Sequence, residues 1–569
     1  MKKNLALFLC VVMMLSALFG CSGNATPAAP AAEAPKAEEP APAEETKEEP
    51  AAAQATDLEA NSIIRFTQTT MPKIDPGIGS DFAACTVLVN IYDPLVQPTH
   101  AGSVEPWIAT SWSVAEDGLT WTFKIRDDVV FHSGNKLTAE DVAYSMNRIL
   151  TMGTGFGYLF SSTVESAEAT DATTLVIHCK KPSGTLLAAL VRLYVLDSET
   201  VKAHYAAGDY GENQDYGQAF LLENDAGSGP YKVEEYKANN YIQGIMFDGY
   251  WGSFEENTPK RFKVYCSNEA VTVKTQMQRE ELECGDKYQS AETLAELDAM
   301  DGVDLILTNG GSVIYLLMNN QKAPTDDVHI RRALGYMMDY QTLIDYVYPG
   351  SKQAKSVVSS NLLGFKEIFD FSYNVEKAKE EIALSKYADT IADYPIEVCW
   401  VAETADREKM ALLIQAVGSQ IGLNIKVTKT PWTSVVANAA TIAGTPNVTT
   451  TLASADYCEA GATLTSAFTS KEDGQGTWLN CSWLQDAELD AMIADATSTL
   501  DEAARVEKYQ AIQDYLGERC VCVPLLEQAE RFAYQSKYVE WNAAQPDQLI
   551  PVMGYVFYMR NIKIYPDKR

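Results

Sequence analysis

The sequence predicts a mixed α/β protein built as two lobes. Two stretches alternate between strand and helix: an apolar run at residues 313–318 precedes a helix capped near Asp327, and a strand at 396–401 precedes a helix and a strand starting at Ile425. Such strand–helix–strand units are typical of a parallel sheet covered by helices. The roughly 500 residues that follow residue 60 are enough for two or three hydrophobic cores.

A β-hairpin is predicted between residues 111 and 126. Trp121, Phe123 and Ile125 alternate with polar residues after an Asp117-Gly118 turn, and period-two alternation beside Asp-Gly is typical of a hairpin with one buried face. Further along, Thr138 is followed three residues later by Asp141, a capping-box pattern. The sequence therefore predicts a helix that starts at this threonine.

The C-terminal part predicts two helices, at 486–496 and 501–516, followed by a strand at 520–525. Cys520 and Cys522 alternate with valines, so we expect both on one face of that buried strand. Nine cysteines follow Cys21, none in a CxxC pair, and the five histidines are scattered. A zinc site is therefore not expected, and we predict buried free thiols, with disulfides left open.

The N-terminus resembles a bacterial lipoprotein signal. Lys2 and Lys3 precede an apolar run at 5–15, which is too short for a permanent membrane span, and Cys21 follows Gly20. We therefore predict a signal peptide at 1–20 and lipidation of Cys21. Residues 21–60 are mostly Ala, Pro and Glu, a composition that cannot form a core and predicts a disordered tether.

Charge and motifs point away from several functions. The net charge of −32 argues against nucleic acid or an anionic membrane as a partner. The Gly227-Ser228-Gly229 segment lacks the spacing of a nucleophile elbow, and no HExxH motif occurs. The sequence therefore offers no motif of a secreted hydrolase or of a metalloprotease, and neither an enzyme nor a cofactor is expected.

Several motifs in the right order resemble the family-5 extracellular solute-binding proteins of ABC importers. They include Val-Glu-Pro-Trp-Ile-Ala at 104–109, Asp-Gly-Leu-Thr-Trp-Thr-Phe at 117–123, Thr-Ala-Glu-Asp-Val at 138–142, Gly-Ser-Gly-Pro-Tyr at 227–231 and Asn-Asn-Gln-Lys-Ala-Pro at 319–324. The resemblance implies a periplasmic-binding-protein-like clamshell, type II and cluster C-like, that closes around a small ligand. It divides the chain into lobe I at 61–311, with an accessory subdomain near 88–207, lobe II at 312–529, and a return to lobe I at 530–569.

The resemblance also selects ligand residues in lobe II. In peptide-binding relatives, an aspartate after a Gly-Trp pair neutralises the ammonium group of the ligand, and Asp456 takes that place here, flanked by Ser454 and Tyr457. The tryptophan is replaced, because Ala453 and Ser454 stand there. Glu459 could add a second carboxylate to the site or simply be solvated, and solvation is the favoured interpretation.

Other candidates are implied for lobe I and for aromatic platforms. The residues after the first strand would line the cleft and pair with an extended ligand: Gln68, Thr69, Thr70 and Met71. Tyr92 and Trp432 are weaker candidates, since aromatic residues lie more often in the core. No arginine is singled out to bind a carboxylate.

The expected function is capture of a small ligand, with a peptide favoured, and delivery to the permease subunits by a monomer anchored outside the cell membrane through lipid. Two alternatives stay open. A protein of this fold could sense peptides without transport, or it could bind a nickel chelate, an opine or a sugar.

Overall fold

The computed structural model describes residues 58, 60–267, 269–474, 479–545 and 548–569. The predicted signal peptide, Cys21 and nearly all of the predicted tether lie outside the described residues. Within the described ranges, none of the helices is both long enough and apolar enough to cross a membrane.

Two large hydrophobic cores organise the described chain, and we call the parts around them lobe I and lobe II. The first core takes buried residues from Ile64–Ile306 and Phe532–Ile564, joined by a short segment around Tyr457. The second core takes buried residues between Val313 and Leu526. The chain is therefore mixed α/β with two lobes, as the sequence predicts, and the segment around Tyr457 belongs to lobe II but packs against lobe I.

Lobe I contains two four-stranded sheets. The first has the order β1-β10-β9-β8, with β1 (Ile63–Gln68) parallel to β10 (Arg261–Cys266). The second, in the accessory subdomain, has the order β4-β5-β7-β6 and includes the predicted hairpin of β4 (Ala109–Val114) and β5 (Thr120–Ile125). The three apolar residues of β5 are buried, so the hairpin prediction is confirmed.

The remaining elements of lobe I connect or cover these sheets. Helix α3 starts after Thr138, whose backbone N–H donates to Asp141 Oδ2 at 2.9 Å, so the predicted capping box is present. The other elements are β6 (Val164–Asp171), β7 (Thr174–Cys179), β8 (Tyr231–Lys237), β9 (Tyr241–Met246), α2 (Phe82–Ile91), α3 (Ala139–Met152), α4 (Leu186–Ala189), α5 (Ser198–Ala203), α6 (Ala270–Gln278), α7 (Ala291–Asp298), β2 (Val96–Pro98), β3 (Val104–Pro106), β17 (Val539–Trp541) and β18 (Ile562–Ile564).

Lobe II is built on a six-stranded sheet of order β12-β16-β11-β15-β13-β14. Strand β13 is parallel to both β14 and β15, which agrees with the predicted strand–helix–strand units. Its elements are β12 (Lys352–Gln353), β13 (Ile396–Val401), β14 (Ile425–Thr430), β15 (Val448–Ala453), α8 (Val328–Tyr336), α9 (Tyr340–Thr342), α10 (Val375–Leu384), α11 (Ala405–Gln420), α12 (Trp432–Asn438), α13 (Ala460–Phe468), α14 (Ala487–Ser498) and α15 (Glu502–Arg519).

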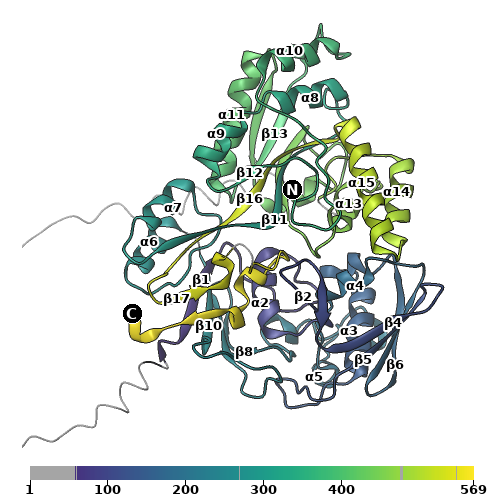
Figure 1. The fold of residues 1–569 in the computed structure, drawn as a ribbon, viewed down its shortest axis with the longest axis vertical. Helices are drawn as coiled ribbons and strands as arrows, with labels where there is room; N and C mark the ends of the chain where they lie inside the picture. The colour runs from purple at the N-terminus through teal and green to yellow at the C-terminus, as the bar shows by residue number, and fades with distance from the viewer. Residues whose placement is uncertain (1–57, 59, 268, 475–478, 546–547) are drawn as a thin grey trace, which may run out of the picture. The chain divides into compact units, whose positions relative to one another are not determined.

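Two antiparallel strands, β11 (Asp304–Met318) and β16 (Cys522–Tyr534), connect the lobes and run side by side (Figure 1). Their register is interrupted between Asn309 and Ser312, where a Cβ on Gly310 would lie 2.5 Å from Glu530 Cγ. The glycine therefore permits an irregularity that a larger residue would prevent. The predicted lobe boundaries at 311/312 and 529/530 fall in these strands and stay predictions.

Two sequence predictions in this region need correction. Strand β11 starts nine residues before the predicted run, because its first half is partly exposed and lacks a continuous apolar pattern. Cys520 is not in a strand: it ends α15 in the left-handed conformation at φ 44°, and β16 starts at Cys522. No disulfide joins the nine cysteines of the described chain, and eight of them are buried.

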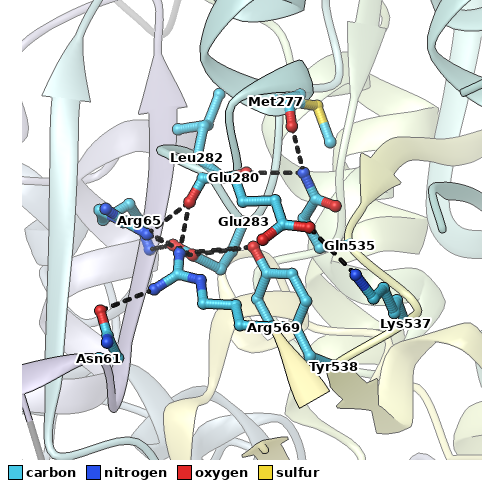
Figure 2. A network of polar contacts seen from close by, with 10 residues as sticks. All are labelled: Asn61, Arg65, Met277, Glu280, Leu282, Glu283, Gln535, Lys537, Tyr538 and Arg569. Carbon is cyan, nitrogen blue, oxygen red and sulfur yellow. Dashed lines mark hydrogen bonds and ion pairs between the residues drawn. The ribbon is translucent and has the colours of Figure 1, made fainter. Parts of the chain in front are cut away.

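A buried polar network joins β1 to the end of β16 (Figure 2). The Glu283 side chain is fully buried and accepts hydrogen bonds from Arg65 Nη2 at 2.6 Å and Tyr538 Oη at 3.2 Å, and it also pairs with Arg569. The next residue, Cys284, bridges Phe66 and Tyr534. The network therefore holds the sheet that contains β1 against the end of β16, one of the two strands that connect the lobes.

His132 forms a second buried ion pair, in lobe I. Its Nδ1 lies 2.5 Å from Asp225 Oδ1 and its Nε2 lies 2.9 Å from the Gly229 carbonyl oxygen. Both partners are acceptors, so both ring nitrogens donate and the imidazole is positively charged. Burial opposes this charge, but the charge and hydrogen bond of Asp225 outweigh it, and the pKa of His132 is raised.

This raised pKa predicts a pH-dependent stability. The stabilisation is fully present below the unfolded-state pKa of about 6.5 and is lost as pH rises through the higher folded-state value. Urea unfolding between about pH 6 and pH 9 should show this loss, and His132→Gln should flatten it. His178→Gln, at a half-exposed histidine beside Glu168, is the control and should keep the wild-type slope. A wild-type slope in His132→Gln would contradict the assignment.

Candidate functional site

The candidate site lies where the loop after β15 meets lobe I. Strand β15 lies between β11 and β13 near the middle of the sheet, and the residues that follow it emerge at the carboxyl end of the parallel pair β13 and β15. Ligand sites of α/β sheets form preferentially at this end. The loop carries Ser454, Asp456 and Tyr457, and the hydroxyl of Ser454 lies 2.7 Å from that of Ser312.

Asp456 is buried at the contact between the lobes. Tyr158, from lobe I, donates its hydroxyl to Asp456 Oδ2 at 2.6 Å. Arg192, also from lobe I, donates from Nε to the Asp456 carbonyl oxygen at 2.8 Å. Burial raises the pKa of Asp456, and the Arg192 charge and the Tyr158 hydrogen bond partly offset this rise. The carboxylate therefore needs a positive or donating partner, and Tyr158 takes only one of its acceptor positions.

Arg192 is a functional candidate that the sequence analysis missed. It is fully buried, its Nη1 donates to the Met553 carbonyl oxygen at 3.0 Å, and its Nη2 has no hydrogen-bond partner among the described residues. An arginine inside an apolar stretch, here between Val191 and Leu193, is unusual, because arginine is rarely buried without a partner. That signal in the sequence could have identified it.

A small cavity of about 10 Å³ lies beside Ser454. It is lined by residues of both lobes and of β16, among them Phe82, Lys287, Glu530 and Met553. Lys287 Nζ lies 3.3 Å from Glu530 Oε1 and 3.6 Å from the centre of the Phe82 ring. The cavity therefore has one polar wall, formed by an ion pair, among apolar side chains.

A second group of buried cationic side chains lies at the start of α11. Arg407, Arg531 and Tyr348 are each at most 2% exposed. Arg531 Nη2 donates to Asp406 at 2.9 Å, but Arg531 Nε, Arg407 Nη1 and the Tyr348 hydroxyl have no hydrogen-bond partner among the described residues. The Asp406 carboxylate is shared by Arg531 and Lys409, and buried donors of this kind require a further acceptor.

The start of α11 faces lobe I. Lys409, in the first turns of the helix, pairs with Glu292 of α7 at 2.6 Å. Arg407 also lies within electrostatic range of Tyr288 in lobe I, whose ring packs edge-on against Phe82. The arginine group and the Phe82 side of the cavity are therefore connected through Tyr288.

The lobe I segment predicted to line the cleft is partly buried. Gln68 is 1% exposed, and neither its Nε2 nor its Oε1 has a hydrogen-bond partner among the described residues. Thr69 and Met71 are half-buried, whereas Thr70 is exposed. Gln68 thus carries a buried, unpaired amide at the end of β1, as a ligand-facing residue would.

Three predicted residues have other neighbours in the structure. Tyr92 lies in the first core, and its ring packs near Tyr194. Trp432 is half-buried at the start of α12, and its backbone N–H donates to Glu403. Tyr457 is buried with its hydroxyl near Thr185 of lobe I. A ligand role for Tyr92 and Trp432 stays a prediction.

The expectation for Glu459 is wrong. The side chain is buried rather than solvated, and it pairs with Arg505 through two hydrogen bonds of 2.9 Å, from Nε and Nη2. Its partner lies 46 residues away in sequence, so no local pattern could reveal it.

Among the described residues, no group of three or more His, Cys, Asp or Glu side chains is placed to hold a metal ion.

Comparisons with known proteins identify the family of the chain. Residues 103–475 match the family model for bacterial extracellular solute-binding proteins, family 5. The chain is 25% identical over 477 residues to the probable D,D-dipeptide-binding periplasmic protein DdpA of Escherichia coli, covering 81% of this chain and 87% of that one. It is 26% identical over 410 residues to the dipeptide-binding protein of the same organism, covering 66% and 73%.

The fold is also similar to solved structures. The periplasmic binding protein DppA of Helicobacter pylori, in complex with the peptide STSA, superposes with a TM-score of 0.73 at 20% identity, covering 88% of this chain and 98% of that one. At this identity the superposition shows the fold alone, and that fold is the two-lobed binding protein expected from the sequence. The family model extends over more than half of the chain, so the chain belongs to the family-5 bacterial extracellular solute-binding proteins.

Proposed function

We propose that this chain is the solute-binding component of an ABC importer and that its ligand carries both an ammonium group and a carboxylate, as a short peptide does. The observation that carries the proposal is that the chain offers both a buried acceptor, Asp456, and the buried and incompletely paired donors of Arg407 and Arg531. Asp456 and Arg407 lie on lobe II, and Arg531 lies on the connecting strand β16.

The ammonium end would bind at Asp456. The buried carboxylate favours a cationic partner, because a charge-assisted hydrogen bond offsets the cost of desolvation. Tyr158 holds one oxygen at 2.6 Å, which orients the carboxylate and leaves the other oxygen to accept from a ligand. Gln68, with its unpaired amide, could pair with the backbone of the ligand from lobe I.

The carboxylate end would bind at Arg407. Its Nη1 is buried and has no hydrogen-bond partner among the described residues, and the Tyr348 hydroxyl lies close to the same guanidinium group. Both lie by the N-terminal turn of α11, where the helix dipole also favours an anion. A ligand carboxylate there would satisfy donors that Asp406 alone does not.

Transport and lipid anchoring rest on other support. Two of the relatives named above are dipeptide-binding proteins, and DdpA is described as periplasmic. The signal-like N-terminus with Cys21 supports an anchored protein outside the cell membrane. Deleting the gene should abolish uptake of the ligand. Binding in vitro with unchanged uptake would instead support the sensing alternative.

The two ends can be tested separately by calorimetry with dipeptides in three forms: free, N-acetylated and C-amidated. Asp456→Asn should weaken binding of the free dipeptide by about 1.5–3 kcal/mol, the usual contribution of a charged hydrogen bond. Arg407→Gln should weaken binding by a similar amount. Asp389→Asn, at an exposed carboxylate of lobe II, is the control and should bind normally.

The modified ligands assign each residue to one end. N-acetylation of the dipeptide should weaken binding to the wild type but should weaken binding to Asp456→Asn little further. C-amidation should have the same pattern with Arg407→Gln. In each case the variant has already lost the interaction that the modified ligand cannot make. Fully additive losses in both combinations would remove these residues from the site. Failure of the wild type to bind any peptide would overturn the peptide proposal.

A further inference from the structure

A glycine turn of lobe I is in direct backbone contact with a loop of lobe II. The Gly184 N–H donates to the Thr497 carbonyl oxygen at 2.9 Å. A Cβ on Gly184 would lie 1.9 Å from the Thr499 carbonyl oxygen and 2.8 Å from Arg505 Nη1. Real Cβ atoms do not approach backbone oxygen so closely, so this contact is possible only with glycine at position 184.

The lobe II side of the contact is held rigidly. Arg505 is 4% exposed and its Nη1 donates to the carbonyl oxygens of Thr499 at 3.0 Å and Leu500 at 3.2 Å. Lys508 Nζ donates to the Thr499 hydroxyl at 2.8 Å, and Asp501 caps the following helix. The loop cannot easily move aside to admit a side chain on Gly184, because three of its residues are fixed by α15.

An apolar contact extends the same interface. A Cβ on Gly118, in the turn between β4 and β5, would lie 3.2 Å from Leu500 Cδ1 and 2.9 Å from Pro182 Cβ. Leu500 therefore lies next to both the hairpin turn and the segment before Gly184. The accessory subdomain thus meets the α14–α15 loop through one backbone hydrogen bond and one leucine side chain.

The interface is connected to the candidate ligand loop. The same Arg505 that holds the 499–500 carbonyl groups pairs with Glu459, three residues after Asp456. Thr185, next to Gly184, lies at the Tyr457 hydroxyl. One buried arginine therefore contacts both the ligand loop and the loop that receives Gly184.

We propose that this contact is a closure contact of the binding protein, with Gly184 as the residue that allows the lobes to close fully and the Arg505–Glu459 pair as the positioning element that ties closure to the Asp456 loop. The inference rests on the proposed function, because it assumes that a ligand is enclosed between the lobes. In the open form the Gly184 turn faces no loop, so a side chain there is tolerated. A substitution at 184 consequently acts on closure rather than on folding.

The test compares wild type with Gly184→Ala and Gly184→Val, using a dipeptide that the wild type binds. Both variants should unfold at the wild-type temperature without ligand. Their affinity should fall by about fivefold or more, since overpacking costs typically correspond to at least that factor. Small-angle scattering should show that both variants compact less than the wild type on ligand addition. The defect should be larger in Gly184→Val than in Gly184→Ala. Lys181→Ala, an exposed change three residues away, should behave as wild type.

Two outcomes would overturn the inference: wild-type affinity and compaction in Gly184→Val, or a loss of ligand-free stability in both variants. If the wild type binds no peptide, the proposed function fails instead. Disulfide trapping of the ligand-free protein then decides separately, with one cysteine placed in the turn before Gly184 and one in residues 497–500, because oxidation captures molecules that close transiently. Slower cross-linking in Gly184→Val than in wild type supports the contact, and an equal rate overturns it.

Discussion

Replacing Asp75 with Asn is expected to lower the free energy of unfolding by about 3–5 kcal/mol, the usual result of removing one partner of a buried ion pair. Arg148 is 1% exposed and donates from Nη1 and Nη2 to the two Asp75 oxygens, each at 2.7 Å. Asparagine has nearly the same shape but cannot neutralise the guanidinium group. The variant therefore leaves a buried charge that water cannot reach.

Urea unfolding at neutral pH measures this loss, and Asp128→Asn is the matched control. Asp128 pairs with Arg126 at 2.7 Å, but its side chain is 60% exposed, so its loss should cost no more than about 1 kcal/mol. A similar small loss in Asp75→Asn would show that the Arg148 charge is solvated or paired elsewhere.

The second large effect is expected for Glu283→Gln. The carboxylate is fully buried between Arg65 and Arg569, and Tyr538 donates to the same oxygen (Figure 2). Burial raises the pKa of Glu283, with the Arg65 hydrogen bond and charge acting in the opposite direction. Glutamine keeps the volume but leaves two guanidinium groups without a counter-charge, so we expect a loss of about 3–5 kcal/mol.

Glu296→Gln provides the comparison for this network. Glu296 pairs with Lys274, but its side chain is 59% exposed, and its replacement should change stability by less than about 1 kcal/mol. Differential scanning calorimetry of both variants separates the two cases. Equal melting temperatures would mean that Arg65 and Arg569 do not depend on this carboxylate.

Local sequence patterns predict most of the fold. They do not predict which residues far apart in the sequence contact each other. The hairpin around Trp121 and the capping box at Thr138 depend on residues a few positions apart, and both are present. The first half of β11 was missed because its residues are only partly buried. Cys520 was misplaced because an alternating pattern cannot show that a helix ends in a left-handed residue.

The candidate site shows the same division. Asp456 was predicted from resemblance, and it lies between the lobes, but its partners Tyr158 and Arg192 are 298 and 264 residues away. Periodicity carries no information on such pairs. Glu459 is an example. The sequence favours a solvated side chain there, because it does not show that Arg505 lies close enough to pair with it.

The pairing of β11 with β16 has a mechanical consequence. Because β11 and β16 are hydrogen-bonded to each other, neither strand can change direction independently of the other. Rotation of one lobe relative to the other therefore has to twist this two-stranded ribbon as a unit. The break in register near Gly310 interrupts the hydrogen-bond ladder, so it is a place where that ribbon can bend or twist. The two lobes can therefore move relative to each other in few directions, so little orientational entropy is lost when they close.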